Sequence, residues 1–266
     1  MASGVPFEVV EQIIDDVAKN RNNLSSIKAC ALVCHSFLPL CRKHIFASVT
    51  LNARNPFSPS GTSDDLNRLL LNSPYLAVYI RKLDYIFNKN EFVAERFSWL
   101  VPMFKKLVKL QHLSIRYSPA SLDWMSSSVP KVLLPLLHLP TLTSISLSSF
   151  RNFALEDLAG CVNLKELEIE FLECSNGVGE FLEALPTTPA MLERLAICNG
   201  NIRPVQQLCH ARRPDGKPII DFSLLREIRA DVIRLDSLKD LFGMCRNLRN
   251  ITISSMSLPH LISSSI

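Results

Sequence analysis

Several features that would assign this chain to a defined class are missing from its sequence. No apolar run reaches the roughly 18 residues that a membrane-spanning helix needs. The start, Met1 to Pro6 followed by acidic residues, has neither the basic opening nor the uncharged core of a secretory signal. A net charge of +4 in 266 residues is too small to favour nucleic acid as a partner. We therefore expect a cytoplasmic and/or nuclear protein with neither a membrane nor a nucleic-acid partner.

The motifs of catalysis are missing as well. There is no Gly-x-Ser-x-Gly, no His-Glu-x-x-His and no phosphate-binding loop, and the six histidines have no carboxylate or nucleophile at a telling spacing. Gly177-Val-Gly179 resembles part of a dinucleotide loop but lacks its third glycine, so we interpret it as a turn before a helix. We expect a non-catalytic protein without a cofactor or a metal.

A phrase of the form Leu-x-x-Leu-x-Ile recurs between residues 80 and 253. Its fourth and sixth positions point to one face of a strand, and the residue between them is polar in all copies but the one with Ala196. This alternation predicts a short, half-buried strand in each copy. The seven copies begin at Ile80, Leu110, Leu142, Leu164, Leu192, Leu225 and Leu248.

One such strand cannot bury its apolar face alone, whereas stacked copies share a continuous core. Steps between fourth positions range from 22 residues (Ile145 to Leu167) to 33 (Leu195 to Ile228), which leaves room for helices. This part of the chain resembles a leucine-rich-repeat protein with irregular repeats. The resemblance implies an α/β fold, a solenoid with a parallel sheet and flanking helices over 48–266. The family often has Asn or Cys five residues after the fourth position, but here only Asn88 matches, so the curvature stays open.

Helices are expected between the strands, and a first, unpartnered strand is expected at 49–51. Residues 52–63 are rich in turn formers and predict an exposed linker loop, after which Ser63 or Asp64 can cap a helix. The expected helices are 65–72, 92–107, 129–137, 155–159, 178–185, 205–211 and 237–244.

Two places could bind a partner on the repeats. The turn at 210–218 carries Arg212, Arg213 and Lys217, and we interpret it as a solvated turn, with contact to an acidic substrate as the alternative. The residue before each fourth position is expected to be exposed on the sheet, where repeat proteins bind. These residues are Lys82, His112, Ser144, Glu166, Arg194, Glu227 and Asn250.

The eight cysteines are predicted to be free thiols. Cys161 and Cys245 each occupy a position where other repeats have Leu or Phe, which predicts core positions. A group near the N-terminus contains no Cys-x-x-Cys pair, so we interpret its cysteines as buried thiols and not as a metal site. The group consists of Cys30, Cys34, Cys41, His35 and His44.

The first 47 residues are predicted to be three helices. Apolar residues recur at i, i+4 and i+8 within 5–20, which indicates an amphipathic helix with Pro6 in its first turn. A second helix is expected over 24–40, with Ser25 or Ser26 as its cap, and a third from Pro39 through Phe46.

Two motifs in this segment match a known pattern. Val5-Pro6-Phe7-Glu8-Val9 corresponds to the Leu-Pro-x-Glu start of the F-box, and Leu32-Val-Cys-His-Ser-Phe37 corresponds to its Leu-Val-Cys-Arg-x-Trp/Phe, with His35 in place of the basic residue. The segment therefore resembles an F-box, and the run from Ala31 to Phe46 is similar to the F-box proteins that are abundant in mushroom-forming fungi. An F-box followed by leucine-rich repeats is a common arrangement in that family.

The resemblance implies the substrate-recognition subunit of a cullin–RING (SCF-type) ubiquitin ligase. The F-box, 1–47, would dock on a Skp-type adaptor, and the repeats would bind an unknown substrate protein. The alternative is a leucine-rich-repeat interaction scaffold with no ligase link, whose first helices only cap the solenoid. Carried over by position, the adaptor contacts are Pro6, Glu8, Val9, Ile13, Val33, Cys34 and Phe37.

Overall fold

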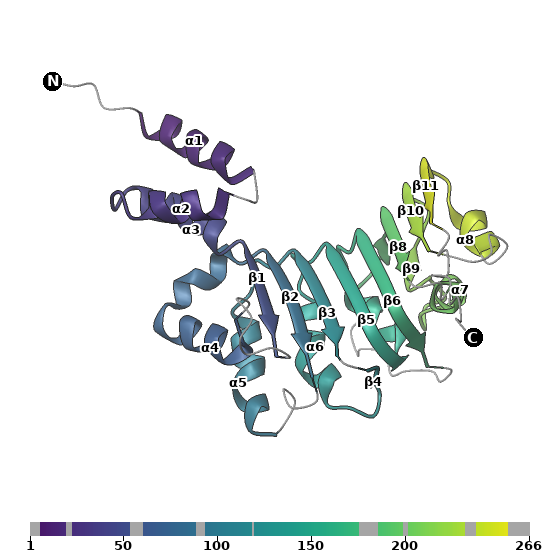
Figure 1. Ribbon diagram of the computed structural model, residues 1–266. Helices are drawn as coiled ribbons and strands as arrows, with labels where there is room; N and C mark the ends of the chain where they lie inside the picture. The colour runs from purple at the N-terminus through teal and green to yellow at the C-terminus, as the bar shows by residue number, and fades with distance from the viewer. Residues whose placement is uncertain are drawn as a thin grey trace, which may run out of the picture.

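The protein has a mixed α/β fold built on a nine-stranded parallel sheet. Figure 1 shows the strands side by side, with helices along the sheet. The computed structural model describes residues 6–19, 23–53, 61–88, 94–118, 120–175, 186–198, 202–231 and 238–254, without the side chains of 94–98. Eight strands follow one another across the sheet in the order β1-β2-β3-β5-β6-β8-β10-β11, and β4 pairs with β5. The strands are β1 (Ser48–Asn52), β2 (Lys82–Phe87), β3 (His112–Tyr117), β4 (Leu122–Asp123), β5 (Ser144–Phe153), β6 (Glu166–Cys174), β8 (Arg194–Cys198), β10 (Glu227–Ala230) and β11 (Asn250–Ile253).

All seven copies of the Leu-x-x-Leu-x-Ile phrase lie in one register. Each fourth-position residue pairs with the fourth-position residue of the next copy, as Leu83 does with Leu113 and Leu167 with Leu195. The same register continues through Ile228 to Ile251. The prediction that these segments form neighbouring parallel strands is therefore confirmed.

Helices pack on the face of the sheet that carries the leucines and isoleucines. Buried side chains of the strands and of these helices form one core, which extends from Leu51 to Leu241. The opposite face, which we call the open face, carries the alternating polar residues. The elements between the strands are α4 (Ser63–Asn72), η2 (Pro74–Tyr79), α5 (Ala94–Lys105), α6 (Val129–Leu137), η4 (Leu155–Gly160), α7 (Arg203–His210) and α8 (Lys239–Met244).

The predicted helices agree with these elements within about three residues, but the 3-10 helix η2 was not predicted. Pro102 lies inside α5 without ending it, and the segment at 155–159 is a 3-10 helix. The helix predicted at 178–185 lies outside the described residues. A second, two-stranded sheet of β7 (Ala190–Met191) and β9 (Ile220–Asp221), like β4, was not predicted.

Two predictions around the first strand are wrong. The strand at 49–51 is not without a partner, because it belongs to β1 and pairs with β2, Val49 lying opposite Leu83. The cap of α4 is Thr62 and not Ser63 or Asp64. The Thr62 side chain accepts a hydrogen bond from the backbone N–H of Asp65, whose carboxylate accepts one from the backbone N–H of Thr62 in return. Of the predicted linker loop, Asn52 ends β1, and 54–60 lie outside the described residues.

The first three helices form a separate unit at the β1 end of the sheet (Figure 1). They are α1 (Phe7–Lys19), α2 (Leu24–Ala31) and α3 (Phe37–Ile45). We call them the helical unit. It has its own small core of Ile14, Ile27, Leu40 and Cys41. The predicted helix over 24–40 was too long, because the chain turns at 32–36, and no side chain caps α2 at its start.

The helical unit is attached directly to the sheet. After α3, the carbonyl of Ala47 accepts hydrogen bonds from the backbone N–H groups of Arg81 and Lys82, both at 2.9 Å. The Arg42 guanidinium lies 5.1 Å from the centre of the Tyr75 ring in η2. Nowhere in the described ranges is there a helix long and apolar enough to cross a membrane.

Candidate functional site

The helical unit has several large apolar side chains that are exposed to solvent. Val9 and Ile13 of α1 are 44% and 55% exposed, and Leu32 and Val33 in the turn after α2 are 88% and 69% exposed. Aliphatic side chains are normally buried in a folded protein, so a group of this kind on a small unit indicates a surface for a partner.

The structure divides the seven predicted adaptor contacts into two groups. Phe37 is half-buried and packs against the core of the helical unit, so its first role is structural. The other six are exposed: Pro6, Glu8, Val9, Ile13, Val33 and Cys34. Sequence reasoning had missed Leu32, the most exposed large apolar residue of the unit. The sequence feature that could have indicated Leu32 is its position next to Val33 at the end of an apolar stripe.

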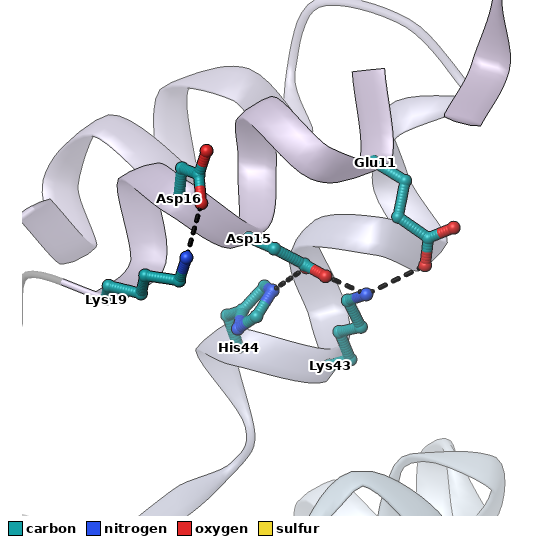
Figure 2. Close-up of polar contacts among 6 residues, drawn as sticks. All are labelled: Glu11, Asp15, Asp16, Lys19, Lys43 and His44. Carbon is teal, nitrogen blue, oxygen red and sulfur yellow. Dashed lines mark hydrogen bonds and ion pairs between the residues drawn. The ribbon is translucent and has the colours of Figure 1, made fainter. Parts of the chain in front are cut away.

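A cluster of charged side chains, shown in Figure 2, holds α1 against α3. The Lys43 ammonium on α3 lies 2.9 Å from a carboxylate oxygen of Glu11 and 2.8 Å from one of Asp15, both on α1. The Nε2 of His44 lies 2.7 Å from the same oxygen of Asp15. Because Glu11 and Asp15 are four residues apart on one helix, they project from the same side of α1 and both reach α3.

The cluster shifts the protonation equilibria of two of its members. Hydrogen bonds from Lys43 and His44 hold the pKa of Asp15 below its usual range. Burial opposes the charge on Lys43, but its hydrogen bonds to Asp15 and Glu11 outweigh burial and raise the pKa of its ammonium group. Both shifts favour the charged forms, so the contact between α1 and α3 is ionic at neutral pH.

All eight cysteines are free thiols. In the helical unit, Cys41 is buried as predicted, and burial raises the pKa of its thiol. Cys34 is exposed, so its interpretation as a buried thiol is wrong. In the repeats, Cys161 is buried and Cys245 packs against the core, in agreement with their predicted core positions. Within the described part of the chain, no three His, Cys, Asp or Glu side chains are placed to hold a metal ion.

The open face of the sheet carries two rows of aligned side chains. Each strand of the repeats contributes one residue to each row. Their alignment follows from the shared register of the strands. The first row is the set predicted to be exposed, Lys82, His112, Ser144, Glu166, Arg194, Glu227 and Asn250. The second row is Asp84, Ser114, Ser146, Glu168, Ala196, Arg229 and Thr252.

A hollow of about 320 Å³ lies on the open face over β6, β8 and β10. Ala196 has the smallest side chain of the second row, and its small size opens the space between Glu168 and Arg229. We call this space the Ala196 hollow. It is lined by Ser144, Ile145, Glu166, Leu167, Glu168, Arg194, Leu195, Ala196, Glu227 and Arg229.

Most charges around the Ala196 hollow are already paired. Arg194 forms an ion pair with Glu166 on the neighbouring strand, and Arg229 Nε lies 2.8 Å from a carboxylate oxygen of Glu227. Glu168 is exposed, and its carboxylate forms no ion pair within the described ranges; the Cys198 Sγ lies 3.8 Å from its Oε1. The free charge in the hollow is therefore a carboxylate.

The basic turn at 210–218 differs from its prediction at one residue. Arg213 is buried and pairs with Asp215 at 3.1 Å, and it also donates to the carbonyl of Pro186. The guanidinium therefore links this turn to the segment at Pro186. Because it is buried, it is not available to bind an acidic partner protein. Arg212 and Lys217 are exposed, as a solvated turn requires.

The sequence matches no protein-family model and no curated protein. The resemblances to the F-box and to leucine-rich repeats therefore stay predictions that rest on the residues and on the geometry described above.

Proposed function

We propose that this protein is the substrate-recognition subunit of a cullin–RING (SCF-type) ubiquitin ligase. In this proposal the helical unit is an F-box that docks on a Skp-type adaptor, and residues 48–266 are a leucine-rich-repeat solenoid that binds the substrate protein. The observation that carries the proposal is the set of exposed apolar side chains on the helical unit, with Ile13 and Val33 at 55% and 69% exposure. Burial of such apolar side chains in a groove on a partner protein is more favourable than their exposure to water.

The shape of the helical unit supports a docking role. Its own core consists of four buried residues, which is little for an independent fold, so a partner would add the apolar contact that the unit lacks. The unit lies at one end of the sheet (Figure 1), so a bound adaptor leaves the open face accessible to a substrate.

The alternative, a scaffold whose first helices only cap the solenoid, is less favoured by the same surface. A cap turns its apolar stripe toward the first repeat and its polar side to water. In α1 the residues that face the small core are Val10, Ile14 and Val17, whereas Val9 and Ile13 face water. The apolar surface of α1 thus exceeds what capping requires.

The test is binding to a purified Skp-type adaptor by the full chain and by the double variant Ile13→Asp/Val33→Asp. We expect the double variant to bind at least about tenfold more weakly, because each carboxylate would be buried without a partner in the interface. Both side chains are exposed in the free protein, so its folding should be unaffected. Binding is measured by calorimetry and folding by circular dichroism.

A matched control variant replaces two exposed apolar residues outside the helical unit. Leu71 of α4 and Val78 of η2 are 65% and 45% exposed, and the variant Leu71→Asp/Val78→Asp should keep full adaptor binding. If the wild-type chain binds no Skp-type adaptor, the scaffold alternative is favoured. Equal weakening in both variants would instead refute the assignment of the contact face.

A further inference from the structure

The charged side chains around the Ala196 hollow carry more negative than positive charge. Three carboxylates, Glu166, Glu168 and Glu227, line it together with two guanidinium groups, Arg194 and Arg229. Because Arg194 and Arg229 each pair with a glutamate, an incoming anion would have to break an ion pair. A cation meets Glu168, which no cation of the described residues neutralises.

The thiol of Cys198 on the neighbouring strand lies in the same negative potential. Burial raises the pKa of the Cys198 thiol to about 11, and the carboxylates of Glu168, Asp231 and Glu170 add to the rise. A thiol whose ionisation is opposed by three carboxylates lies in a field that attracts positive charge.

The shape of the hollow favours a protein segment over a small molecule. All residues that line the hollow belong to strands of the sheet, so a small molecule in it would leave much of its surface in water. The neighbouring positions on β3 and β5 are serines, Ser114, Ser144 and Ser146, which form a low polar surface. A chain segment can cross this surface and insert one long side chain into the hollow.

We propose that the Ala196 hollow binds a lysine or arginine side chain on an exposed segment of a partner protein, with Glu168 as its pairing carboxylate. This inference rests on the proposed function in one respect: if the protein is a substrate receptor, its substrates are proteins with an accessible basic segment. Glu170, two residues further along β6, does not compete for the cation, because Arg116 at 3.0 Å and Ser148 at 2.8 Å occupy its Oε2 atom.

The first step of the test is selection of a displayed library of random 12-residue peptides on the full chain. We expect the selected peptides to share a Lys or Arg at a fixed position. A selected peptide and its Lys→Gln (or Arg→Gln) form are then measured by fluorescence polarisation against wild type and Glu168→Gln. We expect the two substitutions to be non-additive by about threefold or more, as for a direct ion pair.

Two further variants separate a specific site from general attraction. Glu173→Gln removes the same charge from an exposed position on β6, five residues and therefore about 16 Å from Glu168. At physiological salt this distance exceeds the Debye length of about 8 Å, so this variant should not couple to the peptide cation. Ala196→Leu fills the hollow without changing the charge and should weaken binding of the selected peptide by about tenfold or more.

Three results would overturn the proposal. They are a selection without a basic consensus, equal binding of selected peptides to Glu168→Gln, and equal coupling of the peptide cation to Glu173. Adaptor binding takes no part in this experiment. A chain that selects basic peptides through Glu168 and binds no Skp-type adaptor would refute the proposed function alone, and the reverse result would refute this inference alone.

Discussion

Adjacent isoleucines on α1 have opposite surroundings, and this contrast carries the functional argument. Ile14 is 2% exposed in the core of the helical unit, whereas Ile13 is 55% exposed. A helix turns by about 100° per residue, so two neighbouring apolar residues cannot both face one narrow core. The sequence shows that α1 has a broad apolar stripe. Only the placement of α2 and α3 determines which part of the stripe stays in water.

Polar side chains just before the strands tie neighbouring repeats together. Asn163 Nδ2 donates to the carbonyl of Pro140 at 2.7 Å, and Asn247 Nδ2 donates to that of Ser223 at 2.9 Å. The hydroxyl of Thr141 bonds the carbonyl of Leu110 at 2.7 Å in the same way. These bonds lie at the start of the strands, whereas the asparagine positions sought in the sequence lie after them.

We predict that Asn163→Ala lowers the free energy of unfolding by about 0.5–1.5 kcal/mol, the net contribution of one hydrogen bond. Urea unfolding followed by fluorescence of Trp99 and Trp124 measures the change. Asn163→Asp is the informative control. It keeps the size of the side chain but has no N–H donor for the Pro140 carbonyl, so it should be no more stable than the alanine variant. Full stability of the aspartate variant would show that the bond contributes nothing.

At the scale of the elements, the contact between α1 and α3 should depend on pH. An aspartate whose pKa is lowered by folding stabilises the fold above its unfolded pKa of about 3.9, and this stabilisation is lost as pH falls through the lower folded value. We predict that amide hydrogens of α1 lose protection below about pH 4, before those of the sheet. The effect is small, because Asp15 and Lys43 are 40% and 32% exposed.

Hydrogen exchange measured by mass spectrometry at several pH values tests this dependence. Lys43→Met keeps the length of the side chain and removes its charge, so it should reduce the protection of α1 at neutral pH and weaken the loss on acidification. Lys19→Met removes a charge that forms an ion pair with Asp16 on α1 itself, and it should leave the ion pairs between α1 and α3 in place. An identical response in the two variants would argue against the ionic contact.

The strands could be predicted from the sequence, but several connections could not. The Leu-x-x-Leu-x-Ile phrase fixes both the alternation and the register, because each copy must present its leucines to the same core. The turn at 32–36 interrupts a continuous helical pattern, so no local signal marked it. The pairs β4–β5 and β7–β9 contain two residues per short strand and depend on chain segments that only the tertiary structure brings together.

The candidate sites show the same limit. The motif at Val5 to Val9 placed the predicted contacts on α1, yet it could not separate Ile13 from Ile14. Ala196 stood out in the sequence as the one apolar residue among polar second-row positions. That it forms a hollow beside Glu168, which has no cationic partner among the described residues, depends on the ion pairs of Arg194 and Arg229 with other glutamates. Spacing alone cannot predict such partner choices.

At the scale of the whole molecule, the two hydrophobic cores are separate. The large core begins at Leu51 in β1 and contains none of the four buried residues of the helical unit. The joining contacts are few and include the Arg42–Tyr75 pair, an interaction worth about 0.5–1 kcal/mol at exposed sites. The sheet should therefore fold without the helical unit.

We predict that a chain lacking residues 1–46 unfolds cooperatively in urea, with a free energy of unfolding lower by about 1–2 kcal/mol for the lost cation–π pair and the lost packing of Phe46 against the large core. It should lose adaptor binding completely and keep the selection of basic peptides through Glu168. If the helices are instead a cap, as the scaffold alternative holds, their removal exposes the edge of the large core. The shortened chain would then aggregate or unfold without cooperativity, and the division at residue 47 would be wrong.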